Sequence, residues 1–270
     1  MISNRKSDSN FVTPGCVGRP LMDTEIRVVD PDEVVGDTPR KPLPDGQPGL
    51  VLVRGPQVMK GYYKNTEASS KAIDTFGYFD TGDLGRFNPL TGDLILTGRA
   101  KDTIVLSNGE NIEPSPIEDA ILTECGPYID QVMLSGQDGR YLTAICVLNP
   151  VELHNNEDIT LSMSKEDAAK LQKEIDAIND PKCSIDACEA SSAIVNEANT
   201  KYLQDNEALY NALLQNVRSA TSNNPKFQKW ETVNKVFLTF EPFAMSNGLL
   251  TQSYKVKRDK VFKRYEELLK

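Results

Sequence analysis

Short apolar strand patterns, separated by turn-forming residues, fill the first 97 residues of the chain. Residues 24–29 alternate apolar and charged side chains, and residues 49–54 and 94–97 are further apolar stretches of strand length. Proline, glycine and aspartate cluster between these stretches, and Thr-Gly-Asp at 91–93 is typical of a hairpin turn. The pattern predicts an α+β protein that begins with a small β-barrel-like subdomain over residues 1–97.

The pattern changes at residue 98, where we place a domain boundary. A strand at 103–106 precedes a helix for which Ser115 is the predicted N-cap and Pro116 the first residue. Strands are predicted at 129–134, 141–148 and 233–240, and a last helix from about residue 258. Residues 151–230 are polar with short helical stripes, which predicts a helical insertion in a second domain spanning 98–270. This insertion either packs on its own domain or serves a regulatory or partner-binding role.

Charge and cysteine usage exclude several classes of protein. The formal net charge of -9 argues against a general binder of nucleic acid or anionic membranes. Five scattered cysteines, without a Cys-x-x-Cys pair, favour a reduced, intracellular protein over a disulfide framework. With His154 as the single histidine, we expect no metal site in this chain. No apolar run is long enough to span a bilayer, and the first ten residues are too polar for a signal peptide.

The first motif that suggests chemistry is Tyr-Phe-Asp-Thr-Gly-Asp at residues 78–83. An aromatic pair followed by Thr-Gly-Asp suits a strand that stops in a tight turn and presents a carboxylate. The two oxygens of Asp83 could accept hydrogen bonds from both hydroxyls of a ribose. Taken alone, the segment is more typical of an aspartate that caps a turn.

A second motif spans residues 98–114 and reads Gly-Arg-Ala-Lys-Asp before a strand and Ser-Asn-Gly after it. The planar guanidinium of Arg99 can contact ribose or phosphate oxygens. Lys101 is an ordinary surface charge unless this segment is a joint between domains. Gly109 could let a ligand approach the backbone, although Ser-Asn-Gly is equally a plain β-turn.

A third motif, Asn247–Arg258, combines small polar residues with the cations Lys255, Lys257 and Arg258. A lysine on such a loop can neutralise negative oxygens that crowd together during phosphoryl or adenylyl transfer. Without further context, a basic run before a helix is usually solvated surface.

In their order and spacing, these motifs resemble the adenylate-forming superfamily of acyl-CoA synthetases, adenylation domains and luciferases. Residues 78–83 resemble its Thr-Gly-Asp motif, residues 98–118 its hinge motif and residues 247–258 its C-terminal lysine motif. Residues 54–63 look like the strand segment that precedes Thr-Gly-Asp. The sequences of these motifs most resemble the C-terminal part of long-chain acyl-CoA or acyl-ACP synthetases. Tyr254 stands where adenylation domains and luciferases usually have a glycine, as is usual in long-chain synthetases.

The resemblance implies a role for five residues. Asp83 would hold the ribose hydroxyls of ATP or AMP, and Arg99 would support the ribose and phosphate region. Lys101 would lie at the hinge, and Gly109 would lie close to the pantetheine arm of CoA. Lys255 would be the catalytic lysine that bridges the carboxylate and the α-phosphate.

The resemblance also implies an activity. A long-chain fatty acid-CoA ligase activates its fatty acid with ATP as acyl-AMP and transfers the acyl group to CoA, or to acyl-carrier protein. Residues 1–97 would then end the AMP-binding domain, and residues 98–270 would be its mobile lid domain. Magnesium would enter with the ATP phosphates, through ligands upstream of this chain.

Some parts of such an enzyme are not found in the sequence. We find no glycine-rich phosphate loop and no Tyr-Gly-x-Thr-Glu motif. We therefore expect a fragment of a working ligase; the alternative is a non-catalytic interaction or regulatory module. The resemblance is compatible with peripheral association at the cytoplasmic face of the endoplasmic reticulum or another membrane, or with a plastid protein.

Overall fold

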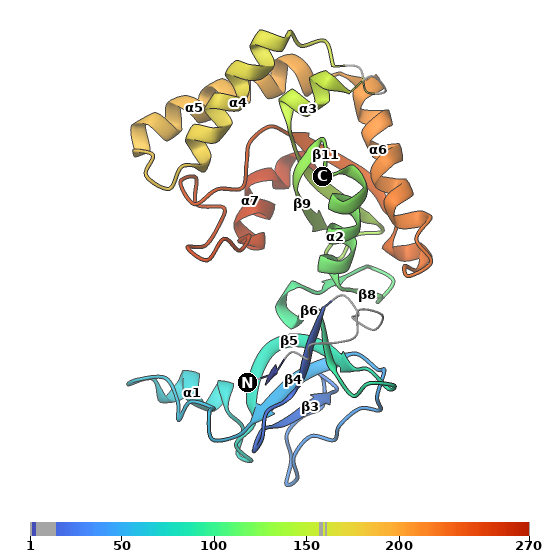
Figure 1. Ribbon diagram of the computed structural model, residues 1–270, viewed down its shortest axis with the longest axis vertical. Helices are drawn as coiled ribbons and strands as arrows, with labels where there is room; N and C mark the ends of the chain where they lie inside the picture. The colour runs from blue at the N-terminus through green and yellow to red at the C-terminus, as the bar shows by residue number, and fades with distance from the viewer. Residues whose placement is uncertain (1, 4–14, 157–158, 160, 270) are drawn as a thin grey trace. The chain divides into compact units, whose positions relative to one another are not determined.

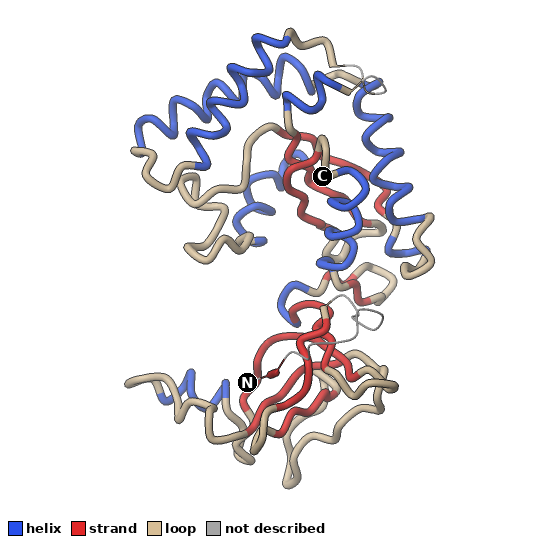
Figure 2. The backbone as a smooth tube through the Cα atoms, viewed as in Figure 1, coloured by secondary structure: helices blue, strands red, loops and turns tan. Residues whose placement is uncertain are grey.

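The computed structural model describes residues 2–3, 15–156, 159 and 161–269 (Figure 1). The chain divides into two compact units, Met1–Thr103 and Ile104–Lys270, called unit 1 and unit 2 below. Helices and strands are mixed, as Figure 2 shows, and the predicted α+β class is confirmed. Residues 98–103, which the sequence analysis placed in the second domain, belong to unit 1. The functional meaning of the division stays a prediction.

Unit 1 is built on an antiparallel sheet with the strand order β1-β2-β6-β5-β4-β3. The strands are β1 (Ile2–Ser3), β2 (Cys16–Pro20), β3 (Glu25–Val29), β4 (Gly49–Arg54), β5 (Phe79–Phe87) and β6 (Leu94–Arg99). A short helix, α1 (Thr66–Ala72), lies between β4 and β5 in the sequence.

The predicted barrel-like closure of this sheet is wrong. Among the described residues, β1 pairs only with β2, and β3 pairs with β4 and has a single further bridge, between Val29 and Pro42. A barrel closes when its two edge strands pair with each other. Within the part of the chain that the structure describes, these two edge strands do not pair with each other, so no closure of the sheet is observed.

Strand β4, which lies between β5 and the edge strand β3, is buried on both faces of this sheet. Successive residues of a strand point to opposite sides, and Leu50 and Leu52 accordingly lie in one apolar cluster, Val51 and Val53 in another. Full burial of one such side chain contributes at most about 1.5–3 kcal/mol to the stability of unit 1.

Tyr78, which is 1% exposed, contacts two arginine side chains. The guanidinium carbons of Arg27 and Arg54 are each 4.6 Å from its ring centroid, which is a cation–π distance. The tyrosine hydroxyl donates a 2.5 Å hydrogen bond to Oε1 of Glu25. Burial and this hydrogen bond raise the pKa of Tyr78 to about 12. The same hydrogen bond is the main cause of a lowered pKa at Glu25.

We expect Tyr78 to make the stability of unit 1 depend on pH in the alkaline range. Its pKa in the fold is about 12, whereas tyrosine in an unfolded chain titrates at about 10, so the fold favours the neutral hydroxyl. That contribution is fully present below a pH of about 10 and is lost as the pH rises through the folded pKa. In ¹³C-tyrosine NMR, the signal of Tyr78 is identified as the one that is missing from the spectrum of the Tyr78→Phe variant. That signal should titrate near pH 12. A midpoint at about 10 would contradict the burial argument.

Unit 2 contains a three-stranded sheet in the order β11-β10-β9. Its strands are β9 (Ile129–Ser135), β10 (Leu142–Leu148) and β11 (Val233–Thr239). β10 runs antiparallel to β9 and parallel to β11. A short hairpin of β7 (Ile104–Val105) and β8 (Asn111–Ile112) precedes this sheet in the sequence.

Helices cover both faces of the three-stranded sheet. Helices α2 (Pro114–Cys125) and α6 (Glu207–Ser222) pack against each other on one face, and α7 (Arg258–Leu269) lies on the other (Figure 1). Successive residues of β10 point to opposite faces of the sheet and therefore pack against different helices. Cys146 belongs to the cluster that contains side chains of α2 and α6, whereas Ile145 belongs to the cluster that contains α7.

The connection from β10 to β11 carries the predicted helical insertion. A parallel neighbour requires a long crossover rather than a tight turn. This crossover consists of α3 (Pro150–Asn155), α4 (Lys165–Asn179), α5 (Ile185–Ala198), a π-helical turn (Asn199–Leu203) and α6. Apolar residues from its helices, including Leu171 and Leu213, join the same core as α2. The insertion therefore packs on the unit that contains it.

Helix α2 begins earlier than predicted. Its first residue is Pro114 and its N-cap is Glu113, so the prediction of Ser115 as N-cap is wrong. Both Pro114 and Pro116 lie in the first turn, where backbone amides have no acceptor within the helix and proline is tolerated. Either proline could start the helix, and local sequence does not decide between them.

Candidate functional site

The Thr-Gly-Asp segment lies inside β5 and not, as predicted, at the end of a strand. The strand is irregular here: Gly82 has φ +69, which residues other than glycine rarely adopt. The amide of Gly82 donates a 2.8 Å hydrogen bond to Oδ1 of Asp80. The carboxylate that caps this bend thus belongs to Asp80, and Asp83 has a different partner.

That partner is Arg99, which faces Asp83 across the β5–β6 ladder. Nε of Arg99 lies 3.3 Å from Oδ1 of Asp83, and the two side chains are 51% and 30% exposed. An exposed ion pair of this kind contributes only about 0–1 kcal/mol, so a ligand can replace it at little cost. Together the two side chains offer acceptors for hydroxyl groups and donors for phosphate oxygens.

Lys101 is exposed and lies in a single 3-10 turn, Ala100–Asp102, directly after β6. Unit 1 ends at Thr103, so this lysine lies two residues before the junction of the units. The position is compatible with a hinge, and the hinge role stays a prediction.

Gly109 occupies the turn between β7 and β8. Its φ is +85, and its amide donates a 2.8 Å hydrogen bond to the carbonyl of Leu106. Apart from Gly109 itself and its two neighbours in the chain, no described heavy atom lies within 4 Å of the position that a β-carbon would take. The backbone conformation therefore requires glycine, while the space around it is open to a ligand.

Residues 247–257, called the lysine loop below, form a narrow hairpin. Leu250 and Val256 are bridged across it. Nearer the tip, the amide of Thr251 donates to the carbonyl of Lys255 at 2.8 Å, and the amide of Lys255 donates to Oγ1 of Thr251 at 3.0 Å. The side chain of Lys255 is exposed at this tip. A fixed backbone with an exposed ammonium group can present one positive charge to an anionic ligand.

Tyr254, beside this lysine, has φ +58. The left-handed region costs a residue with a β-carbon about 1–2 kcal/mol relative to glycine. The structure thus has a glycine-like conformation at the position where the resemblance expects glycine in other branches of the superfamily.

The structure brings only some of the predicted residues together. Asp83 and Arg99 are in contact within unit 1, and Lys101 follows them in the same unit. Gly109 and Lys255 belong to separate hairpins of unit 2.

Two charged pairs that fix α7 escaped the sequence analysis. Arg258 donates two hydrogen bonds to Glu118 of α2, and Arg264 donates two to Glu241. A signal was available for Glu241, because a single acidic residue within the apolar run 236–245 indicates a buried and paired carboxylate. Glu118 likewise lies next to the buried stripe of α2.

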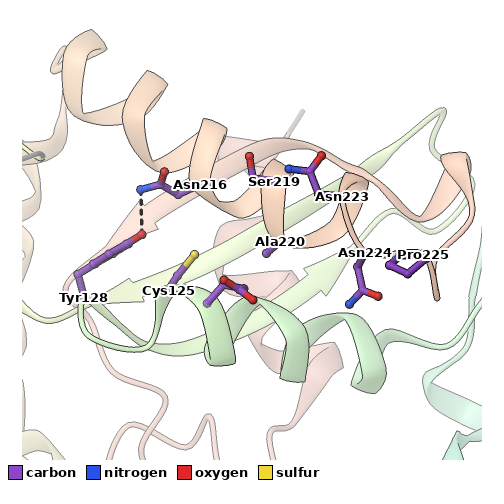
Figure 3. Close-up of a pocket in the computed structure, with 9 residues that line it drawn as sticks. Cys125, Tyr128, Asn216, Ser219, Ala220, Asn223, Asn224 and Pro225 are labelled. Carbon is purple, nitrogen blue, oxygen red and sulfur yellow. Dashed lines mark hydrogen bonds between the residues drawn. The ribbon is translucent and has the colours of Figure 1, made fainter.

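A pocket of about 460 Å³ lies between α2 and α6 (Figure 3). Figure 3 shows amide and hydroxyl groups around it, and Nδ2 of Asn216 donates a 2.8 Å hydrogen bond to the hydroxyl of Tyr128. Burial raises the pKa of the Cys125 thiol, which makes it a poor nucleophile. None of the five predicted site residues lines this pocket.

Metal ligands and membrane spans were also sought among the described residues. They contain no group of three or more His, Cys, Asp or Glu side chains that could hold a metal ion. Over the same ranges, no helix has both the length and the apolar composition needed to cross a bilayer.

Family models match both units of the chain. The AMP-binding enzyme family matches residues 2–63, and the AMP-binding enzyme C-terminal domain matches residues 101–184.

Among curated proteins, similarity extends over most of the chain. It is 34% identical, over 98% of its length, to "Probable acyl-activating enzyme 16, chloroplastic" of Arabidopsis thaliana, and covers 31% of that protein. It is also 34% identical, over 94% of its length, to "Long-chain-fatty-acid--[acyl-carrier-protein] ligase AEE15, chloroplastic" of the same plant, and covers 28% of it. Identity to the "Long-chain-fatty-acid--CoA ligase ACSBG2" of Gallus gallus is 29%, over 85% of this chain and 27% of that protein.

Solved structures share the fold. The A domain of carboxylic acid reductase from Segniliparus rugosus, in complex with AMP and a carboxylic acid, has a TM-score of 0.61 at 23% identity, covering 94% of this chain and 31% of that one. ATP-bound MatB from Rhodopseudomonas palustris has a TM-score of 0.58 at 21% identity, covering 97% of this chain and 38% of that one.

The chain spans about a third of the length of the curated relatives it matches. The two family models match in the order of an AMP-binding enzyme followed by its C-terminal domain, and the relative that is 34% identical matches over 98% of the chain. The chain belongs to the AMP-binding, adenylate-forming superfamily.

Proposed function

We propose that this chain is the C-terminal part of an ATP-dependent fatty-acid ligase. The carboxylate oxygen of the fatty acid attacks the α-phosphorus of ATP, which forms acyl-AMP and releases pyrophosphate. A thiol, on CoA or on an acyl-carrier protein, then attacks the acyl carbonyl carbon and releases AMP and a proton. The fatty-acid substrate is supported by the 34% identity to the Arabidopsis ligase, and the acceptor thiol stays open between the two classes.

The geometry supports a division of labour between the units. In unit 1, Asp83 accepts hydrogen bonds from the ribose hydroxyls, and Arg99 donates to ribose or phosphate oxygens. In unit 2, Lys255 neutralises the charge that develops where the fatty-acid carboxylate meets the α-phosphate. Gly109 lines the approach of the thiol arm, and Lys101 lies at the pivot. A pivot allows unit 2 to withdraw Lys255 before the thiol enters.

The observation that most supports this proposal is the exposed Lys255 at the tip of a hairpin whose backbone is fixed. Charge neutralisation is effective when the charged group is held in place before the reaction. A solvated surface lysine needs no such hairpin.

A chimera tests the proposal directly. The upstream part of the Arabidopsis acyl-carrier-protein ligase is joined to this chain, and ATP–pyrophosphate exchange is measured with a long-chain fatty acid. We expect exchange that depends on the fatty acid and exceeds that of the upstream part alone. A folded chimera without exchange would favour the interaction-module alternative.

In this chimera, Asp83→Ala should raise the KM for ATP by at least about tenfold, because two charge-assisted hydrogen bonds to the ribose are lost. Asp93→Ala is the matched control, since Asp93 forms an ion pair of the same 3.3 Å length with Arg19 but has no proposed ligand. An equal effect of both substitutions on KM would show that Asp83 acts only through the stability of the sheet.

A further inference from the structure

Arg258, the first residue of α7, joins the downstream end of the lysine loop to helix α2. Its Nη1 and Nη2 atoms donate to Oε1 and Oε2 of Glu118 at 2.8 Å and 2.5 Å. The Glu118 side chain is 12% exposed and that of Arg258 is 21% exposed. A bidentate pair fixes the orientation of the guanidinium as well as its distance.

Glu118 is itself held by the sheet. Its Oε1 atom also accepts a 2.7 Å hydrogen bond from the amide of Leu134 in β9. One carboxylate therefore connects α2, β9 and the start of α7. Only two residues separate Arg258 from Lys255, so this junction sets where the hairpin leaves the body of unit 2.

The upstream end of the loop is fixed by different groups. Gln131 of β9 exchanges two hydrogen bonds with the backbone of Phe243, at 3.0 Å and 2.6 Å. The Asn247 side chain accepts from the amides of Ala244 and Leu249 at 3.1 Å and 3.2 Å. With this end secured, the Glu118–Arg258 pair anchors the other end to α2 and β9, in addition to the Leu250–Val256 bridge within the hairpin.

We propose that Glu118 and Arg258 are positioning residues for Lys255. They hold the downstream end of the lysine loop so that the Lys255 ammonium group reaches one fixed place relative to unit 2. The same helix, α2, begins five residues after Gly109. Glu118 thereby keeps the lysine loop and the Gly109 turn in one rigid body. This inference rests on the proposed function of Lys255.

A second pair on α7 provides a matched control. Arg264 donates to Glu241 through Nε, at 3.1 Å, and through Nη2. Glu241 is 3% exposed in its side chain, so this pair also joins α7 to the body of unit 2. Arg264 lies six residues after Arg258 in the same helix and is further from Lys255 along the chain. Arg258→Lys and Arg264→Lys each keep a positive charge but lose the planar fork.

The first measurement is amide hydrogen exchange in the chain itself. Arg258→Lys should increase exchange in residues 249–257 by about tenfold relative to the unchanged protein, because local opening of the loop becomes easier. Arg264→Lys should leave these amides within about twofold. If both substitutions change the loop equally, or neither does, the positioning proposal is overturned.

The second measurement follows the two half-reactions in the chimera. Arg258→Lys should lower kcat for adenylate formation by about ten- to a hundredfold, the loss expected for a misplaced catalytic group, with the KM for ATP unchanged. Thioester formation from supplied acyl-AMP should stay within about twofold. Equal losses in both half-reactions would indicate a purely structural role and would overturn the proposal.

The Lys255→Ala variant is measured in the same assays, to separate a failure of the proposed function of Lys255 from a failure of the positioning role of Glu118 and Arg258. If Lys255→Ala leaves adenylate formation unchanged, the proposed function of the lysine is wrong, and the positioning proposal is wrong with it. If Lys255→Ala slows adenylate formation and Arg258→Lys does not, only the positioning proposal is wrong.

Discussion

Replacing Lys255 with alanine should slow adenylate formation by about 10²–10³-fold, the typical loss when one preorganised charge-stabilising group is removed. The reason is that negative charge accumulates where the fatty-acid carboxylate meets the α-phosphate. Lys255 is the residue of the lysine loop that is proposed to neutralise this charge. The rate of ATP–pyrophosphate exchange in the chimera measures this step. Thioester formation from supplied acyl-AMP should change far less, because the proposed mechanism withdraws Lys255 before the thiol enters.

Lys260→Ala is the control for a general effect of charge. Lys260 is an exposed lysine on α7, five residues further along the chain, and its removal lowers the positive charge of the same region equally. We expect adenylate formation within about twofold of the unchanged chimera, as for other surface charges. Parallel losses in both half-reactions of Lys255→Ala would rule out the role assigned to this lysine.

Arg264→Met should destabilise unit 2 by about 3 kcal/mol, because it leaves the buried carboxylate of Glu241 without its cation. This value is the lower end of the range of about 3–5 kcal/mol that is usual when one partner of a buried ion pair is removed. We choose the lower end because the Arg264 side chain is 42% exposed, so water can partly solvate Glu241 in its absence. The hydroxyl of Tyr265 still donates a 2.8 Å hydrogen bond to Glu241, and burial and Glu241 together raise the pKa of that hydroxyl. One hydroxyl group cannot neutralise a carboxylate.

Urea denaturation followed by tryptophan fluorescence measures this effect. Trp230 is the only tryptophan of the chain and belongs to unit 2, so the signal reports this unit alone. Adding Glu241→Gln to Arg264→Met should recover part of the loss, because it removes the unpaired charge. A loss below about 1 kcal/mol for Arg264→Met, typical of exposed pairs, would show that Glu241 does not depend on Arg264.

Local pattern predicted most of the elements of the fold. Alternation and apolar runs located β3, β4, β9 and β10 to within one residue at each end, because each strand buries side chains that its own sequence supplies. The barrel prediction failed for a different reason. Whether a sheet closes depends on pairing between its two edge strands, and in this chain those are β1 and β3. No single stretch of sequence encodes that pairing.

The same distinction applies to the candidate site. Motif order and spacing suggested Asp83, Arg99 and Lys255 as site residues, because they lie in short segments with recognisable composition, and their roles stay predictions. Motif spacing did not find Glu118 as the partner of Arg258, because these residues are 140 positions apart. Their contact follows from the packing of α2 and α7 around one sheet, and only a three-dimensional structure places those helices.

The parallel pairing of β10 with β11 has a consequence for biosynthesis. Leu142 pairs with Val233, and the whole helical insertion is synthesised between these two residues. The central sheet of unit 2 is therefore incomplete while α3 to α6 emerge from the ribosome. Until β11 follows, the edge of β10 and the apolar faces of these helices lack their final cover, a situation that favours aggregation or chaperone binding. The lysine loop and α7 emerge later still, so the surface proposed to act on ATP forms only after β11 has been synthesised.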